Sequence, residues 1–167
     1  MEVTKTARLF FTALALALGL VACGDDNSPP AVHYYGSVGS GAGCSENLFK
    51  AYGAEVFTNA AQSLVDLAAA DDTVGAHLAS LSAGDQKTVS AEVATLLGGS
   101  LGGTDEATSA QRAAIEDAFR IAPDDYDHFT DLIGQALSSA GVTPNEINEC
   151  VVPLFADQTF KASFITP

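Results

Sequence analysis

The sequence predicts an all-α fold, and three observations support this prediction. From residue 45 onward, apolar residues recur at the three- and four-residue spacing of a helix face. No run in this region alternates with β-branched residues for long enough to indicate a strand. Helix-starting and helix-ending signals divide the region into several helices of one domain, residues 45–167. A domain of this length can bury a sizeable hydrophobic core.

The chain begins with a segment typical of export signals. Lys5 and Arg8 precede the apolar run LFFTALALALGLV, which is too short to span a bilayer as a mature helix. The run ends in LVAC, which resembles the lipobox of bacterial lipoproteins. The resemblance implies that residues 1–22 are a signal peptide and that Cys23 carries diacylglycerol, which anchors the protein to a membrane. The alternative is an ordinary secretory signal with a chance cysteine.

The mature chain is strongly acidic. Cleavage before Cys23 removes Glu2, Lys5 and Arg8, which leaves 7 − 2 = 5 basic and 21 − 1 = 20 acidic residues. This charge repels phosphate backbones, so we expect no nucleic-acid partner. There is also no polybasic patch, so only the lipid would hold the protein at a membrane. We expect the protein in the bacterial cell envelope, on the periplasmic or cell-surface side.

Residues 23–44 are rich in Gly, Ser, Asp and Pro, and this composition predicts a flexible tether between the lipid and the domain. His33, Tyr34 and Tyr35 interrupt the tether. A lone histidine with two tyrosines in such a segment favours an incidental cluster over a metal site.

Two cysteines remain once Cys23 is lipidated. Cys44 and Cys150 form an even pair in an exported protein, and this predicts a disulfide between them. In the chain-entropy model, closing a loop of about 106 residues stabilises the fold by roughly 4 to 5 kcal/mol. A redox-active role is the alternative, but no C-x-x-C motif and no basic neighbour supports it.

The first half of the domain is predicted to hold two short helical pieces and two longer helices. A short helix over about 46–51 precedes Gly53, a longer one covers 54–70, and a short piece covers about 73–81. The longer helix has its apolar stripe at Val56, Ala60, Ser63/Leu64 and Leu67. Asp85 is expected to cap the fourth helix, which buries Val89, Val93, Leu96 and Leu97 and ends at GGSLGG.

The second half gives clearer boundaries. Residues 105–119 read as a helix, and Pro123 with two acids after it opens the next helix. That helix has an amphipathic stripe of Tyr126, Phe129, Ile133, Ala136, Leu137 and Ala140. The stretch TPNE, residues 143–146, is a capping box before a last helix that Pro153 must kink or restart.

Three segments together resemble the truncated haemoglobins, most closely the group I type. They are LFKAYGAEVF (48–57), ATLLGGSLGG (94–103) and FRIAPDDYDHFTDLIGQALSSAGVTPNEINECVVPLF (119–155), and the match covers nearly all of residues 46–160. The resemblance implies a truncated (2-on-2) globin-like helical domain. It also implies haem and the binding of O₂ or another diatomic gas.

The haem-holding residues of the family do not transfer. The family's proximal histidine lies five residues before the isoleucine of IAPDDY, and that position is Glu116 here. The distal tyrosine falls at Val65 or Asp66, and the distal polar group falls near Glu92 or Val93. The family's phenylalanines before the distal helix fall near His77 and Leu78. The side chains that would line the pocket are Val65, Leu78, Val93, Leu97, Ile115, Phe119, Tyr126, Phe129 and Ile133.

Glu116 is a poor substitute for the proximal imidazole. A carboxylate is a hard, anionic ligand, and its desolvation beside apolar neighbours is costly. Arg112 and Arg120 lie four residues to either side, so we expect Glu116 to form an ion-pair ladder with them on the helix surface. His77 is the other candidate iron ligand. His128 is expected to be an exposed histidine.

The sequence therefore predicts a non-catalytic binding protein with a degenerate haem pocket. Its ligand would be an apolar small molecule or another envelope protein. The alternative is a haem protein that binds a diatomic gas through an unusual iron ligand, His77 or Glu116. An enzyme is not expected, because the sequence has no G-x-S-x-G or H-E-x-x-H motif and only three histidines. The acids Asp71 and Asp72 are interpreted as a helix cap.

Overall fold

The computed structural model describes residues 47–166. In chain order its helical elements are α1 (Leu48–Ala69), η1 (Leu78–Ser80), α2 (Ala83–Ser100), α3 (Ser109–Phe119), η2 (Pro123–Asp125), α4 (Tyr126–Ser139), α5 (Pro144–Glu146), η3 (Ile147–Val151), α6 (Val152–Phe155) and α7 (Gln158–Lys161). The first two η elements are 3₁₀ turns, and η3 is a π-helical turn. Within 47–166 the chain forms no strand apart from an isolated bridge between Ile121 and Ile165. The predicted all-α class is confirmed.

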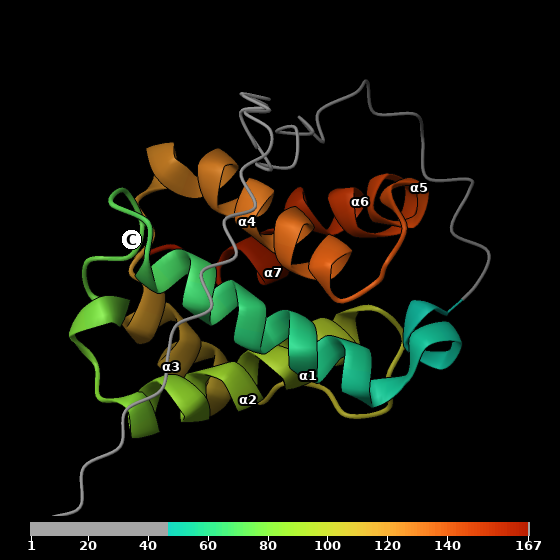
Figure 1. Cartoon of the computed structure of the whole chain (residues 1–167), viewed down its shortest axis with the longest axis horizontal. Helices are drawn as coiled ribbons and strands as arrows, with labels where there is room; N and C mark the ends of the chain where they lie inside the picture. The colour runs from blue at the N-terminus through green and yellow to red at the C-terminus, as the bar shows by residue number, and fades with distance from the viewer. Residues whose placement is uncertain (1–46, 167) are drawn as a thin grey trace, which may run out of the picture. The chain divides into compact units, whose positions relative to one another are not determined.

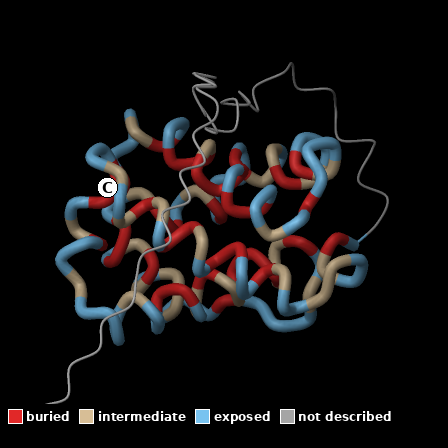
Figure 2. The backbone as a smooth tube through the Cα atoms, in the orientation of Figure 1, coloured by how far each residue is buried: buried red, intermediate tan, exposed pale blue. Residues whose placement is uncertain are grey.

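Helix α1 is the centre of the arrangement. It packs against α2 on one side and against α4 on the other (Figure 1). Helix α3 packs on α2, and the C-terminal elements pack on α4 through η3. Buried residues gather where these helices face one another, and exposed residues cover the outside (Figure 2). None of the helices between residues 47 and 166 has the length and apolar character needed to cross a membrane.

Gly53 divides α1, as the sequence predicts. Its φ of 78° lies in the left-handed region that favours glycine, and it separates a first turn, residues 48–52, from the long part of the helix. We call this first turn the hook. Asn47 caps it, with Oδ1 accepting from the Lys50 backbone N–H at 2.9 Å. The hook is also tied to the end of α2, because the Phe49 N–H donates to the Leu101 carbonyl at 3.1 Å.

The buried face of α1 is wider than the predicted stripe. Val56 and Leu67 are only half-buried, while the additional positions Phe57, Ala61, Val65 and Ala68 are fully buried. The reason is that α1 contacts helices on two sides, so a single stripe does not describe its apolar surface.

Two predicted boundaries in the middle of the chain are corrected. Ser82, and not Asp85, caps α2: its Oγ accepts from the Asp85 N–H at 3.2 Å and donates to the Asp85 carboxylate at 2.7 Å. Helix α3 begins at Ser109 and not at residue 105, because Thr108 and Gln111 form a reciprocal capping box there. In both cases a hydroxyl residue close to the expected position supplies the cap.

The boundaries after α3 agree with the sequence prediction. Pro123 opens η2, which leads directly into α4. Thr143 and Glu146 form the predicted capping box, with Pro144 in the first turn. The chain stays helical through Pro153, which lies in the first turn of α6 directly after the π-helical turn η3. Since proline has no N–H to donate, this restart is the expected way for the helix to pass it.

Candidate functional site

All nine side chains expected to line a haem pocket are buried. They are Val65, Leu78, Val93, Leu97, Ile115, Phe119, Tyr126, Phe129 and Ile133, and none is more than 3% exposed. They belong to one continuous hydrophobic core. The sequence therefore identified residues that do lie together, but they form a packed interior.

An aromatic cluster lies at the centre of this interior. The rings of Phe119 and Phe129 are 5.1 Å apart, and Phe164 packs against both, at 5.7 Å and 4.9 Å between ring centroids. Phe160 packs on Phe164 at 5.4 Å. We call these four residues the aromatic core. Such tilted and edge contacts between buried rings stabilise a fold beyond the burial of their area.

The segment that follows α7 holds Phe164 in place. The Ile121 N–H donates to the Phe164 carbonyl at 3.1 Å, and the Thr166 N–H donates to the Ile121 carbonyl at 3.2 Å. The Arg112 guanidinium donates to Ser163 Oγ at 2.9 Å. The C-terminal segment is thus fixed against the end of α3, and it closes the interior from that side. Sequence analysis missed this role, because Phe160 and Phe164 lie after the last helix of the family resemblance.

The ion-pair ladder predicted around Glu116 does not form. Arg120 ends α3 in the left-handed conformation, with a φ of 49°, and its guanidinium reaches Asp117 at 2.6 Å. Arg112 turns the other way, toward the Ala107 carbonyl and Ser163. Glu116 is half-buried and borders a surface hollow of about 370 Å³. The helix ends too early for Arg120 to occupy the position four residues on that a ladder needs.

His77 lies near the end of α3. It is half-buried and is the residue before η1. The pKa of Asp117 is lowered, mainly by its hydrogen bond and ion pair with Arg120, and the charge of His77 also contributes. No group of three or more His, Cys, Asp or Glu side chains in residues 47–166 is arranged to hold a metal ion.

The four positions that the resemblance assigns to the distal side are two valines and two acids. Val65 and Val93 are fully buried, whereas Asp66 is exposed and accepts from Gln62 at 2.9 Å. Glu92 is half-buried, and burial raises the pKa of its carboxyl. Its Oε2 atom is buried and makes no hydrogen bond to any described residue.

A groove that sequence analysis missed lies between α1 and α2. It has a volume of about 240 Å³ and is lined by Phe49, Ala54, Phe57, Thr58, Ala91, Ala94, Thr95, Gly98, Gly99, Gly103 and Asp105. The Phe49 and Phe57 rings are stacked with centroids 5.5 Å apart. We call this feature the α1–α2 groove. A signal for it is present in the sequence, because Ala91, Ala94 and Gly98 share one face of a helix, and the Phe49 ring packs against Gly98.

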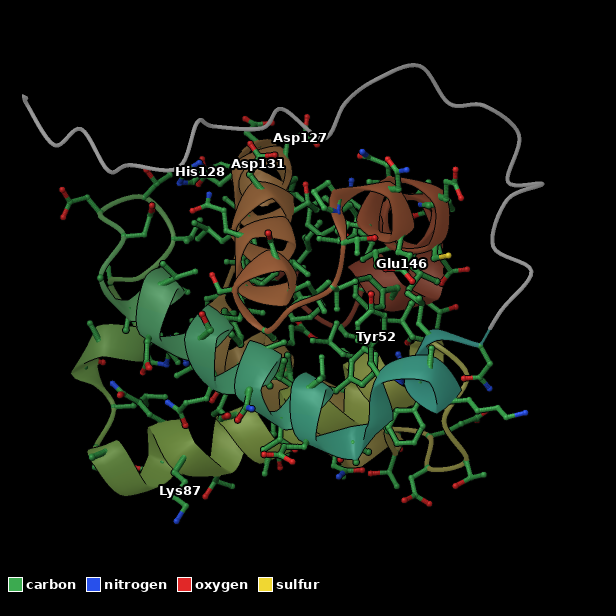
Figure 3. All side chains as sticks on the ribbon, turned by 45° about the vertical axis from the view of Figure 1, so that its right-hand side comes forward. Tyr52, Lys87, Asp127, His128, Asp131 and Glu146 are labelled. Carbon is green, nitrogen blue, oxygen red and sulfur yellow. The ribbon has the colours of Figure 1, made fainter. Side chains whose placement is uncertain are left out.

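A polar contact joins the hook to the capping box of α5. The Tyr52 hydroxyl donates to the Glu146 carboxylate, which also accepts from the Thr143 backbone N–H at 3.2 Å (Figure 3). Hydrogen bonds from Thr143 and then Tyr52 hold the pKa of the Glu146 carboxyl below its usual value. The same contact with Glu146 raises the pKa of Tyr52. Sequence separation hid this pair, although the capping box itself was predicted.

The two ends of α1 are thus both tied to distant residues. At the C-terminal end, His128 is exposed, as predicted, and its Nε2 lies 2.8 Å from Asp71 Oδ2. Asp71 also accepts from the Thr73 and Val74 N–H groups at 2.9 and 3.1 Å. Burial raises the pKa of the Asp71 carboxyl, but these hydrogen bonds outweigh burial and leave it lowered. Asp71 therefore caps a turn, close to the predicted helix-cap role.

The remaining predicted residues lie at or beyond the limit of the described chain. The signal peptide, Cys23, the tether and Cys44 are outside residues 47–166. Cys150 is half-buried and packs against the hydrophobic core. The Cys44–Cys150 disulfide therefore stays a prediction.

Comparison of the chain with protein-family models, with curated proteins and with solved structures finds no match. The resemblance to the truncated haemoglobins therefore rests on the sequence segments quoted above and remains a hypothesis.

Proposed function

We propose that this chain is an exported, lipid-anchored binding domain, built on a truncated-globin-like helical scaffold that takes no haem. Cys23 would carry the lipid, and residues 45–167 would form the binding domain. The domain would be non-catalytic and would bind an apolar group of a small molecule or of another envelope protein.

The aromatic core is the observation that carries this proposal. Phe119, Phe129 and Phe164 are at most 1% exposed, and their rings contact one another in the region where the resemblance places a haem. A haem there would have to displace these rings from a close-packed interior, and overpacking a core by even a few methylenes is destabilising. The loss of the proximal histidine at position 116 points the same way.

The α1–α2 groove is the surface to which we assign the binding. Its volume of about 240 Å³ is below the roughly 300–1,000 Å³ of ordinary small-molecule pockets, so it suits one aromatic or aliphatic group. Its two aromatic residues are Phe49 and Phe57, and most of the other lining residues are alanine and glycine. Such small residues let a ligand approach the backbone closely.

A second candidate function is haem binding at the surface through His77. The charge of His77 contributes to the lowered pKa of Asp117, the residue after Glu116, and this supports a site to which both candidate ligands could contribute. In this case the haem would bind outside the aromatic core, and the protein would bind a diatomic gas there.

Haemin titration separates the two candidates. The experiment uses the mature chain with Cys23→Ser, which prevents lipidation, and records the visible spectrum together with the thermal midpoint. The proposal predicts only the broad spectrum of free haemin and an unchanged midpoint. A sharp Soret band that saturates at one haem per chain, and that is lost in His77→Ala or Glu116→Gln, would establish the haem protein. Asp66→Asn, an exposed carboxylate change on α1, serves as the matched control.

A further inference from the structure

The α1–α2 groove lies next to the point where the described chain begins. Of its two aromatic residues Phe57 is fully buried, whereas Phe49, in the hook, is half-buried and lines the groove two residues after Asn47. The hook is fixed there by the bond of Phe49 to Leu101 and by a hydrogen bond from Asn47 Nδ2 to the Gly102 carbonyl. The first described residue, Asn47, therefore lies at one end of this groove.

The tether contains one apolar element among its polar and glycine-rich residues. Tyr34 and Tyr35 are its two aromatic residues, and they lie between the stretches GDDNSPP and GSVGSGAG. Two adjacent tyrosines add apolar surface to the segment, and burying that surface against the domain is favourable. They have the chemistry of an aromatic ligand: a flat apolar ring with a hydroxyl at its tip.

We propose that the Tyr34–Tyr35 segment of the tether docks in the α1–α2 groove of its own chain. One ring would stack on the half-buried ring of Phe49, and the small side chains of Ala91 and Ala94 leave space for it. The groove volume of about 240 Å³ admits a single aromatic side chain far better than a larger ligand.

The polar rim of the groove fits the rest of the segment. Thr58, Thr95 and Asp105 line the groove, and each carries an oxygen that can accept a hydrogen bond from a phenol. His33 directly precedes Tyr34 and is the one basic side chain between residues 24 and 46. A protonated His33 beside Asp105 would add an attractive charge pair in an otherwise acidic chain.

The length of the intervening chain allows this contact. From Tyr35 to Asn47 there are 47 − 35 = 12 residues, which span up to roughly 40 Å when extended. If Cys44 is fixed by the predicted disulfide, the 44 − 35 = 9 residues before it still span roughly 30 Å. The glycine and serine of GSVGSGAG allow the chain to fold back. A short linker of this kind gives an effective concentration in the millimolar range, so even a weak contact would be populated.

The functional consequence rests on the proposed function, because it requires the lipid on Cys23 and a groove that binds a partner. A docked tether would occupy the groove, and a partner's aromatic side chain would have to displace it. It would also shorten the free chain between lipid and domain from residues 24–46 to residues 24–33. Binding of a partner would thereby release the domain to reach further from the membrane.

The test compares NMR spectra of the mature chain with Cys23→Ser, with and without the further change Tyr34→Ser/Tyr35→Ser. The contact predicts nuclear Overhauser effects from a tyrosine ring to the methyl groups of Ala91 and Ala94. It also predicts that the double change shifts the amide signals of Thr95 and Gly98. Unchanged groove signals together with no ring-to-methyl effect would overturn the proposal.

A blocking variant supplies a second measurement. Ala91→Arg places a long side chain in the groove and should release the tether from it. The release would be seen as faster proteolysis after Tyr34 or Tyr35. Ala110→Arg, on the exposed first turn of α3, should be cleaved at the same rate as the wild type. Equal cleavage rates in the wild type, Ala91→Arg and Ala110→Arg would contradict docking. Contacts that appear only between differently labelled chains would instead indicate a dimer and would also overturn the intramolecular contact. Because the test uses neither lipid nor haemin, its failure leaves the proposed function standing.

Discussion

The protein contains two clusters of phenylalanine that differ in how they are covered. In the aromatic core, Phe164 comes from the C-terminal segment and closes the space beside Phe119 and Phe129. In the α1–α2 groove, the fully buried ring of Phe57 stacks on Phe49, which is only half-buried although Gly98 and Gly103 pack against its ring. Both clusters are built from phenylalanine. They differ because large side chains cover the aromatic core on all sides, whereas one ring of the groove stays partly exposed.

The nine positions expected to line a haem pocket are buried in one hydrophobic core, and Phe164, which lies after the segments that carry the resemblance, packs against two of them. The groove is lined in part by residues of two of those segments, 48–57 and 94–103, but none of the nine expected pocket residues is among them. The spacing of apolar residues alone therefore does not show where a fold leaves room for a ligand.

The largest effect is expected from opening the aromatic core. Phe164→Ala removes a fully buried ring that contacts three others, so the free energy of unfolding should fall by about 3–5 kcal/mol. Urea unfolding followed by circular dichroism measures this loss. A loss below about 1 kcal/mol would show that Phe164 does not seal the interior.

The matched change in the groove should lower the free energy of unfolding by much less. Phe49→Ala removes a ring of the same size that is only half-buried, so we expect a loss of about 1–1.5 kcal/mol, half the value for full burial. The same unfolding assay applies. If the two variants lost equal stability, the groove would be as closed as the core and the comparison would fail.

Much of this contrast could not be predicted from the sequence. The helix class, the Gly53 break, the Thr143–Glu146 capping box and the burial of Phe119 and Phe129 follow from local signals that lie within a few residues. The place of Phe164 and the pairing of Tyr52 with Glu146 depend on contacts across long sequence separations. No periodicity encodes such contacts. The ladder at Glu116 failed for a local reason, since nothing in the sequence signals that Arg120 adopts a left-handed conformation.

The hook contact should have an intermediate effect. Tyr52→Phe removes the hydroxyl that donates to Glu146 and should lower stability by about 1 kcal/mol. Folding lowers the pKa of Glu146. The contribution of this contact to the free energy of unfolding is therefore present above pH 4.5, the ordinary pKa, and is lost as the pH falls through the folded pKa. The difference between wild type and variant should therefore be seen at pH 7 and should shrink in acid. A difference that grows in acid would contradict the contact.

The smallest effect is expected at the other end of α1. Asp71→Asn keeps an oxygen for the Thr73 and Val74 N–H groups but removes the charge that faces His128, so we expect a loss of about 0.5 kcal/mol. Because folding lowers the pKa of Asp71, this contribution to stability is present above pH 3.8, the ordinary pKa, and is lost in more acidic solution. Thermal unfolding at pH 6 in low and high salt checks this, since salt should reduce the difference. A loss above about 2 kcal/mol would mean that the pair does more than join two surface segments.

One titration tests the contrast between sealed core and open groove most directly. The tyrosine side-chain analogue p-cresol is added to the mature chain with Cys23→Ser and Tyr34→Ser/Tyr35→Ser, so that the tether does not compete, and methyl and amide signals are followed by NMR. The account predicts saturable shifts at Ala91, Ala94 and Thr95, with no shift of the core methyl groups of Ile115 and Ile133. Saturable shifts at Ile115 and Ile133, with none in the groove, would show that the interior has kept a ligand pocket and would contradict the account.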